Sequence, residues 1–184
     1  MAFGKFYAPN GRVFSVSTVV AGLAIPISTT TAPTVALRNP RNSGVELNLL
    51  RFSMGHASGN TVASVVGLQF TNEEDYTVFA DSQINPAQYR FGGASPRARA
   101  SAAGTNTLAA AVVNWGCPMF ELDLDTLGTS TSPGNTLFFD FEGLVRLQPG
   151  QGCFVAGNAA SVTLFAQTLW WEEVPIPELP IQAV

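Results

Sequence analysis

The chain has 184 residues and a mass of 19.4 kDa, which fits a single domain. Hydrophobic residues make up 46% of it and charged residues only 12%, where a typical globular chain has roughly 25%. This composition excludes a wholly disordered chain, and the single lysine, Lys5, argues against a coiled coil. The net charge of −4 and a pI near 4.8 disfavour direct nucleic-acid binding through a basic surface.

The shortage of charge has two explanations. Either neutral polar residues cover the surface, or a partner removes much of the surface from water, since interface cores are depleted of charge. All the basic residues except Lys5 are arginine, which is weakly hydrated and binds carboxylates through its planar fork. We therefore expect a chain that assembles with other subunits.

The elements expected along the chain are short strands. Residues 1–12 are typical of an N-terminal arm, and Gly, Pro and Asn then recur between runs rich in Val, Leu, Phe and Thr. This pattern indicates an all-β sandwich or barrel. The expected strands are Val13–Val20, Thr34–Leu37, Val45–Ser53, Val62–Phe70, Thr77–Phe79, Ala110–Asn114, Met119–Leu124, Leu137–Phe141, Gly143–Leu147, Cys153–Ala156 and Ser161–Val174.

The uncharged stretch from Val13 to Leu37 is the only candidate for a membrane span or a signal peptide. It contains Pro26, Pro33 and many Ser and Thr residues, which makes it a poor membrane span. We expect no membrane association and no cleaved signal.

Two strands carry a readable side-chain pattern. In Val45–Ser53 the residues Val45, Leu47 and Leu49 share one face, but the alternation then fades because Leu50 falls on the polar side.

The last expected strand, Ser161–Val174, is apolar on both faces. One side carries Val162, Leu164 and Trp170, and the other carries Phe165, Leu169 and Trp171. Such a strand needs a second sheet on one face and a neighbouring element or subunit on the other.

Turns and loops separate these strands. Asn39–Gly44 is expected to be a loop, Pro149-Gly150 a type II turn, and Gly92–Gly104 a long mobile loop. The tail over residues 175–184 begins with three prolines in six residues, so it cannot extend a central strand and is expected to run over another surface. The whole chain, 1–184, is thus expected to be one antiparallel, jelly-roll-like β-sandwich with extended N- and C-terminal segments.

The residue types that could act in catalysis or bind a metal ion give only weak evidence of a site. The single histidine, His56, lies beside Gly55, where a turn residue is the default. Several carboxylates are spaced so that they would lie on the same face of a strand, which suggests a glycosidase pair or a calcium site. The evidence is weak, because the solvent-facing side of a strand commonly carries charged residues. The pairs are Asp123/Asp125, Asp140/Glu142 and Glu172/Glu173, and the run is Glu73–Asp75. We expect no catalytic residue, no metal and no cofactor.

Two cysteines, Cys117 and Cys153, are too few for a disulfide framework. We expect two buried thiols, with a single bridge as the alternative. The basic cluster of Arg90, Arg97 and Arg99 is read as a solvated loop or as a contact with an acidic partner surface.

Two blocks resemble tailed-bacteriophage virion proteins. The stretch Ala36–Leu49, with its Leu-x-Asn-Pro and Ser-Gly turn, is similar to a turn and strand of that group. The region Leu147–Ala160, together with the ending Trp171-Glu172-Glu173-Val174-Pro175, looks like the carboxy-terminal signature of the same group.

The resemblance implies a non-enzymatic β-sandwich protein of the capsid cement (decoration) type. Such a protein is made in the host cytoplasm, binds the major capsid protein on the outer capsid surface between capsomers, and is often a homotrimer. The alternatives are a receptor- or glycan-binding head of a tail fibre, or another virion coat component. The candidate assembly contacts are Phe3, Phe6, Arg90, Arg97, Arg99, Trp171, Pro177 and Leu179.

Overall fold

The computed structural model describes residues 12–59, 64–86, 95–112, 116–122, 136–159 and 163–177. In these ranges the regular structure is β-strand apart from one 3-10 turn, η2 (Glu73–Asp75), as the pattern of short apolar runs between Gly, Pro and Asn predicted. The strands are β1 (Val13–Ser17), β2 (Leu23–Ala24), β3 (Ala36–Arg38), β4 (Val45–Ser58), β5 (Ser64–Asn72), β6 (Tyr76–Val78), β7 (Asn85–Pro86), β8 (Arg99–Ser101), β9 (Thr107–Leu108), β10 (Cys117–Leu122), β11 (Thr136–Asp140), β12 (Arg146–Leu147), β13 (Gln151–Gly157) and β14 (Leu164–Pro175).

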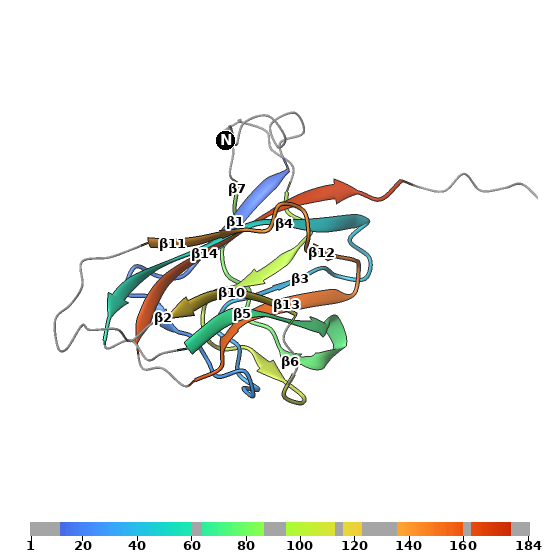
Figure 1. The fold of residues 1–184 in the computed structure, drawn as a ribbon. Coiled ribbons are helices and arrows are strands. Elements are labelled where there is room, and N and C mark those ends of the chain that lie inside the picture. Colours follow the sequence, from blue (N-terminus) through green and yellow to red (C-terminus); the bar gives the residue numbers. More distant parts are fainter. Residues whose placement is uncertain are drawn as a thin grey trace, which may run out of the picture.

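Eight of these strands form the two layers of a jelly roll. Sheet A contains the order β11-β4-β14-β1 and sheet B the order β10-β5-β13-β3, with every neighbour antiparallel. The chain alternates between the sheets except from β5 to β10, which are neighbours in sheet B. This is the strand order of an eight-stranded jelly roll, and Figure 1 shows the sheets stacked face to face. The sandwich predicted from the sequence is confirmed.

The main core lies between the two sheets. Inward-pointing residues of both sheets form it, and its largest fully buried side chains include Trp171, Phe14, Phe52 and Phe141. The rings of Phe14 and Trp171 lie 6.1 Å apart across neighbouring strands. Burial of these large rings supplies much of the hydrophobic stabilisation of the sandwich.

A second, smaller core covers the outer face of sheet B. The β6–β9 pair lies over that face, as Figure 1 shows for β6, and packs Tyr76 and Leu108 against Phe154 and Ala156. Sheet B is therefore covered on both faces. This explains why β13 is apolar at consecutive positions instead of alternating.

The fading alternation in β4 marks a β-bulge. Trp170 pairs with Arg51 and Trp171 with Leu49, so Leu50 is the extra residue on its strand. The bulge reverses the side-chain phase, and Phe52 is therefore fully buried although it lies on the polar side of a regular strand.

Asn39 ties the two sheets together. Its fully buried side chain donates from Nδ2 to the carbonyl oxygens of Val45 (2.8 Å) and Leu147 (2.9 Å), while its backbone N–H donates to Gln151 (2.8 Å). Asn39 directly follows β3 of sheet B, and Val45 and Leu147 belong to sheet A. The loop predicted at Asn39–Gly44 is therefore also an inter-sheet clamp.

The Pro149-Gly150 turn is confirmed. Gly150 has φ +88°, and the N–H of Gln151 donates to the carbonyl of Gln148 at 3.0 Å. These are the features of a type II turn, in which glycine takes the positive φ at no steric cost.

Three predictions of the strand map are wrong. Within the expected mobile loop Gly92–Gly104, the segment Arg99–Ser101 is strand β8, paired with β3. Residues 110–112 form no strand, and within Gly143–Leu147 only Arg146–Leu147 is one. Strand β8 packs small side chains against the core. Because alanine has a low β propensity, the sequence does not predict this strand.

Candidate assembly surface

His56 has no catalytic partner in the described residues. It lies inside β4, where a turn was predicted, because this strand extends five residues beyond the expected end. Its Nε2 lies 2.7 Å from the carbonyl oxygen of Gly59, and its ring packs edge-on against Phe165. These contacts hold the imidazole in a structural role.

The carboxylate pairs do not converge. Asp140 accepts two hydrogen bonds from Arg51, at 2.5 and 2.9 Å, while Glu142 lies exposed in a turn with φ 50°. Glu172 and Glu173 point to opposite faces of β14, and Asp123 and Asp125 lie outside the described residues. The geometry therefore gives no support to the glycosidase hypothesis at the described pairs.

Glu173 is a buried anchor for the segment before β8. Its carboxylate is 2% exposed and accepts hydrogen bonds from the backbone N–H of Arg97 (2.8 and 3.0 Å) and of Ala98 (2.8 Å). On the other face, burial raises the pKa of Glu172, and a hydrogen bond from Asn48 partly opposes the shift.

The acidic run Glu73–Asp75 binds donors of the protein itself. Glu73 accepts from the N–H of Arg41 at 2.9 Å, Glu74 pairs with the Arg41 guanidinium, and Asp75 accepts from Asn72 and from Thr71. These hydrogen bonds lower the pKa of Asp75. Among the described residues no group of three or more His, Cys, Asp or Glu is placed to hold a metal ion.

The outer face of sheet A carries an exposed aromatic beside an ion pair. Phe138 on β11 is 61% exposed, and the Arg51 guanidinium lies 5.0 Å from the centre of its ring while binding Asp140. Trp170, half-buried, stands opposite Arg51 on β14. Sequence reasoning missed this group because its members come from three strands far apart in the chain.

Trp171 was expected to be an assembly contact, and the structure corrects this. Its side chain is 0% exposed and packs against Phe14 between the sheets. Phe165, Leu169 and Trp171 do share one face of β14, as predicted, but that face is the inner one. A residue buried within its own chain is not available to a partner.

The arginine cluster is only partly described. Arg97 is exposed, whereas Arg99 is half-buried, pairs with Asp81 and lies 5.4 Å from the ring centre of Phe79. Arg90 lies outside the described residues. The hydrogen bonds to Asp81 raise the pKa of Arg99.

The predicted contacts in the two arms are mostly outside the described ranges. Phe3, Phe6 and Leu179 lie there, while Pro177 is described and exposed. The preceding residue, Ile176, is 41% exposed and donates its N–H to Gly44 at 3.0 Å. The tail therefore leaves the body beside the start of β4.

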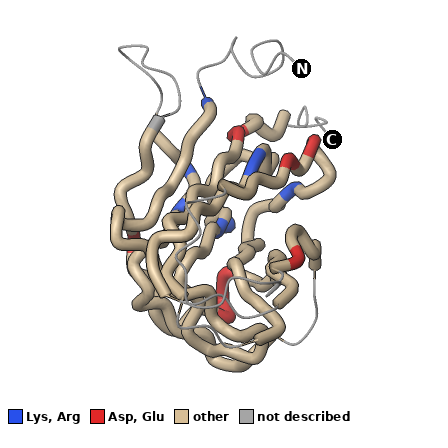
Figure 2. The backbone as a smooth tube through the Cα atoms, turned by 60° about the vertical axis from the view of Figure 1, so that its left-hand side comes forward, with Lys and Arg blue, Asp and Glu red and all other residues tan. Residues whose placement is uncertain are grey.

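Charge is sparse over the described body. In Figure 2 the acidic and basic residues form short, separate segments along an otherwise uncharged chain. Large apolar side chains are exposed in several places, and these are Val19, Val20, Ile27, Phe70, Val78, Phe138, Leu144 and Ile176. Both features are typical of a surface made for contact with other proteins.

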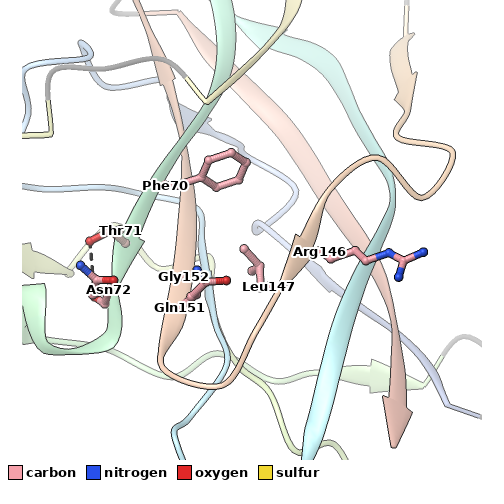
Figure 3. A pocket seen from close by; sticks show the side chains of 7 residues that line it. All are labelled: Phe70, Thr71, Asn72, Arg146, Leu147, Gln151 and Gly152. Atoms are coloured by element: carbon pink, nitrogen blue, oxygen red, sulfur yellow. Dashed lines mark hydrogen bonds between the residues drawn. The ribbon is translucent and has the colours of Figure 1, made fainter. Parts of the chain in front are cut away.

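A pocket of about 240 Å³ lies at one end of the sandwich. Figure 3 shows its lining, which is Phe70, Thr71, Asn72, Arg146, Leu147, Gln151 and Gly152. Arg146 is the one charged residue in this lining, which contains no pair of groups for acid–base catalysis.

Both cysteines are free thiols. Cys153 is completely buried on the inner face of β13, and burial raises the pKa of its thiol to about 12. Cys117 is half-buried, and the pKa of its thiol is also raised by burial. The bridge considered as an alternative is absent.

We expect Cys153 to make the protein sensitive to alkali. The unfolded thiol ionises near pH 9, whereas the folded thiol stays protonated to about pH 12. The unfolded state then binds fewer protons, so the free energy of unfolding falls by about 1.4 kcal/mol per pH unit across this window. Urea unfolding of the wild type and of Cys153→Ala between pH 8 and 11 measures the difference. Equal slopes would contradict the prediction. Tyr76 is present in both proteins, and its pKa is raised mainly by burial and next by Cys153.

The described part of the chain contains no helix of the length and hydrophobicity that a membrane crossing requires. No family model, curated protein or solved structure matches this chain.

Proposed function

We propose that this chain is a non-enzymatic structural protein of a phage virion, a capsid cement protein that stabilises the outer shell. The observation that carries the proposal is the jelly-roll order of its eight main strands. This architecture occurs in viral capsid proteins, lectins and cupins, so the support is an analogy of fold. The chain has a single histidine, so its sequence offers no cluster of histidines for a metal site.

The surface favours a capsid role over a small-ligand role. The exposed apolar side chains are spread over both sheets and the turns, and charge is scarce around them. Many small contacts with several neighbours give avidity without a single tight site. The partner expected on this basis is the major capsid protein on the outer face of the shell, with self-association of the cement subunits.

Binding to shells tests the proposal. Purified protein is added to DNA-free capsids of the phage that carries its gene, and bound copies are counted after sedimentation. We expect saturable binding and a higher melting temperature of the shell. Removing residues 178–184, or substituting Ile176→Asp, is expected to lower occupancy while circular dichroism shows an intact fold. No binding would refute the cement role, and closed particles of the purified chain alone would indicate a coat protein instead.

A glycan-binding head of a tail fibre is the second candidate. It is favoured by Phe138, an exposed aromatic ring beside the carboxylate of Asp140 and the guanidinium of Arg51. Sugars stack on such rings and bond such polar groups. A glycan array that gives hits with the wild type and none with Phe138→Ala would support this function.

A further inference from the structure

We propose that two copies of this chain associate by pairing their β11 strands antiparallel, which joins sheet A of one copy to sheet A of the other. An exposed strand edge is a template for another strand, and proteins usually block it. This inference goes beyond the virion role and does not depend on it.

Three of the four sheet edges are blocked. Strand β7 has two residues, one of them Pro86. Strand β8 has three residues and is covered by Ser82, whose N–H donates to Ala100 at 2.8 Å. Strand β10 contains Pro118 and a register shift before Phe120. Proline, bulges and covering segments all prevent pairing at an edge.

Within the part of the chain that the structure describes, strand β11 has none of these protections. It is the end strand of sheet A, and its sequence Thr-Leu-Phe-Phe-Asp has no proline, no lysine and an unbroken register with β4. Its central residue, Phe138, is 61% exposed. A regular, apolar, unprotected edge of this kind is a pairing site.

The backbone of Phe138 faces the open side. The N–H of Phe141 donates to Leu50 of β4 at 2.9 Å. Because hydrogen-bonding direction alternates along a strand, Phe139 and Leu137 also face β4, and the N–H and C=O of Phe138 point outward. Two copies can therefore exchange a pair of hydrogen bonds at Phe138.

The sequence of β11 is complementary to itself in that register. With Phe138 opposite Phe138 of the second copy, Thr136 faces Asp140 and Leu137 faces Phe139. No two like charges meet, and Asp140 is already neutralised by Arg51 of its own chain. The inner-face residues Leu137 and Phe139, which are partly buried, extend the core across the junction. A twofold pairing of the same patch on both copies is the commonest form of association, and this charge match favours a second copy over another protein.

Light scattering over a range of protein concentrations tests the pairing. We expect the mass to rise toward twice 19.4 kDa with the wild type and to stay at 19.4 kDa with Phe138→Lys and with Phe138→Pro. Proline removes the outward N–H without touching a bond to β4. The matched control is Val78→Lys, which changes a 52% exposed apolar residue on β6 and is expected to dimerise normally. A monomeric wild type, a trimer, or dimers that survive both Phe138 variants would overturn the proposal.

Cross-linking places the contact directly. In a hydrogen-bonded antiparallel pair the facing Cα atoms lie about 5.5 Å apart, which suits a disulfide. In a Cys117→Ser background, Phe138→Cys is expected to give covalent dimers on mild oxidation, and Val78→Cys is not. Equal cross-linking of the two would refute β11 as the contact. Loss of capsid binding with dimerisation intact would refute only the cement role.

Discussion

Replacing Trp171 by alanine is expected to lower the free energy of unfolding by about 3–5 kcal/mol, the range for removing a fully buried aromatic side chain. Trp171 is 0% exposed, and its ring packs against Phe14. The free energy of unfolding of a domain is typically about 5–15 kcal/mol, so the variant loses a large share of its stability. Urea unfolding followed by circular dichroism measures the loss.

The neighbouring Trp170 is a matched control for this experiment. It is the same residue type on the same strand, but it lies half-buried on the outer face of sheet A. Trp170→Ala is expected to cost about 1 kcal/mol, because less apolar surface returns to water. Equal losses for the two variants would show that the inner and outer faces of β14 are assigned wrongly.

This pair of tryptophans also shows what sequence patterning can and cannot provide. The two-residue period correctly separates Trp170 from Trp171, because side chains alternate along a strand. It does not say which face is covered by the second sheet, since both faces of Ser161–Val174 are apolar. That choice depends on the side of sheet A against which sheet B packs, and this arrangement of distant strands leaves no local signal in the sequence.

Other errors have different physical causes. The buried residues Ala98, Ala100 and Ala102 alternate along the chain as in a strand, but alanine has low β propensity, so the sequence predicts a loop there. Leu50 shows the opposite case, in which a break in alternation was seen and its cause, a bulge, was not recognised. Turns were predicted well because Pro149-Gly150 and Gly44 act through their own backbone preferences.

The candidate surface was the least predictable feature. Arg51 and Asp140 are 89 positions apart in the chain, and only the β4–β11 register brings them together. An edge strand is defined by the absence of a neighbour, which depends on the order of the whole sheet. The scarcity of charge in the sequence therefore predicted an assembling chain, but nothing in the sequence selected β11 as the contact proposed above.

Asn39→Asp is expected to destabilise the protein by about 3 kcal/mol or more at pH 7, because the change removes both donors of the inter-sheet clamp. The carboxylate would face the carbonyl oxygens of Val45 and Leu147, which the Asn39 amide now binds at 2.8 and 2.9 Å. Burial would raise the pKa of the new carboxyl above its usual value of about 3.9. Its protonated form can donate one hydrogen bond, so the loss is expected to be smaller at pH 4 than at pH 7.

Asn42→Asp provides the control, because Asn42 lies exposed in the same loop and undergoes the same chemical change. Its effect is expected to stay within about 0.5 kcal/mol, as for most surface substitutions. Chemical unfolding of both variants at the two pH values separates a buried clamp from a general effect of added negative charge. If the Asn39 variant were no less stable than the Asn42 variant, or if its loss grew on acidification, the buried amide would not be what joins β3 to sheet A.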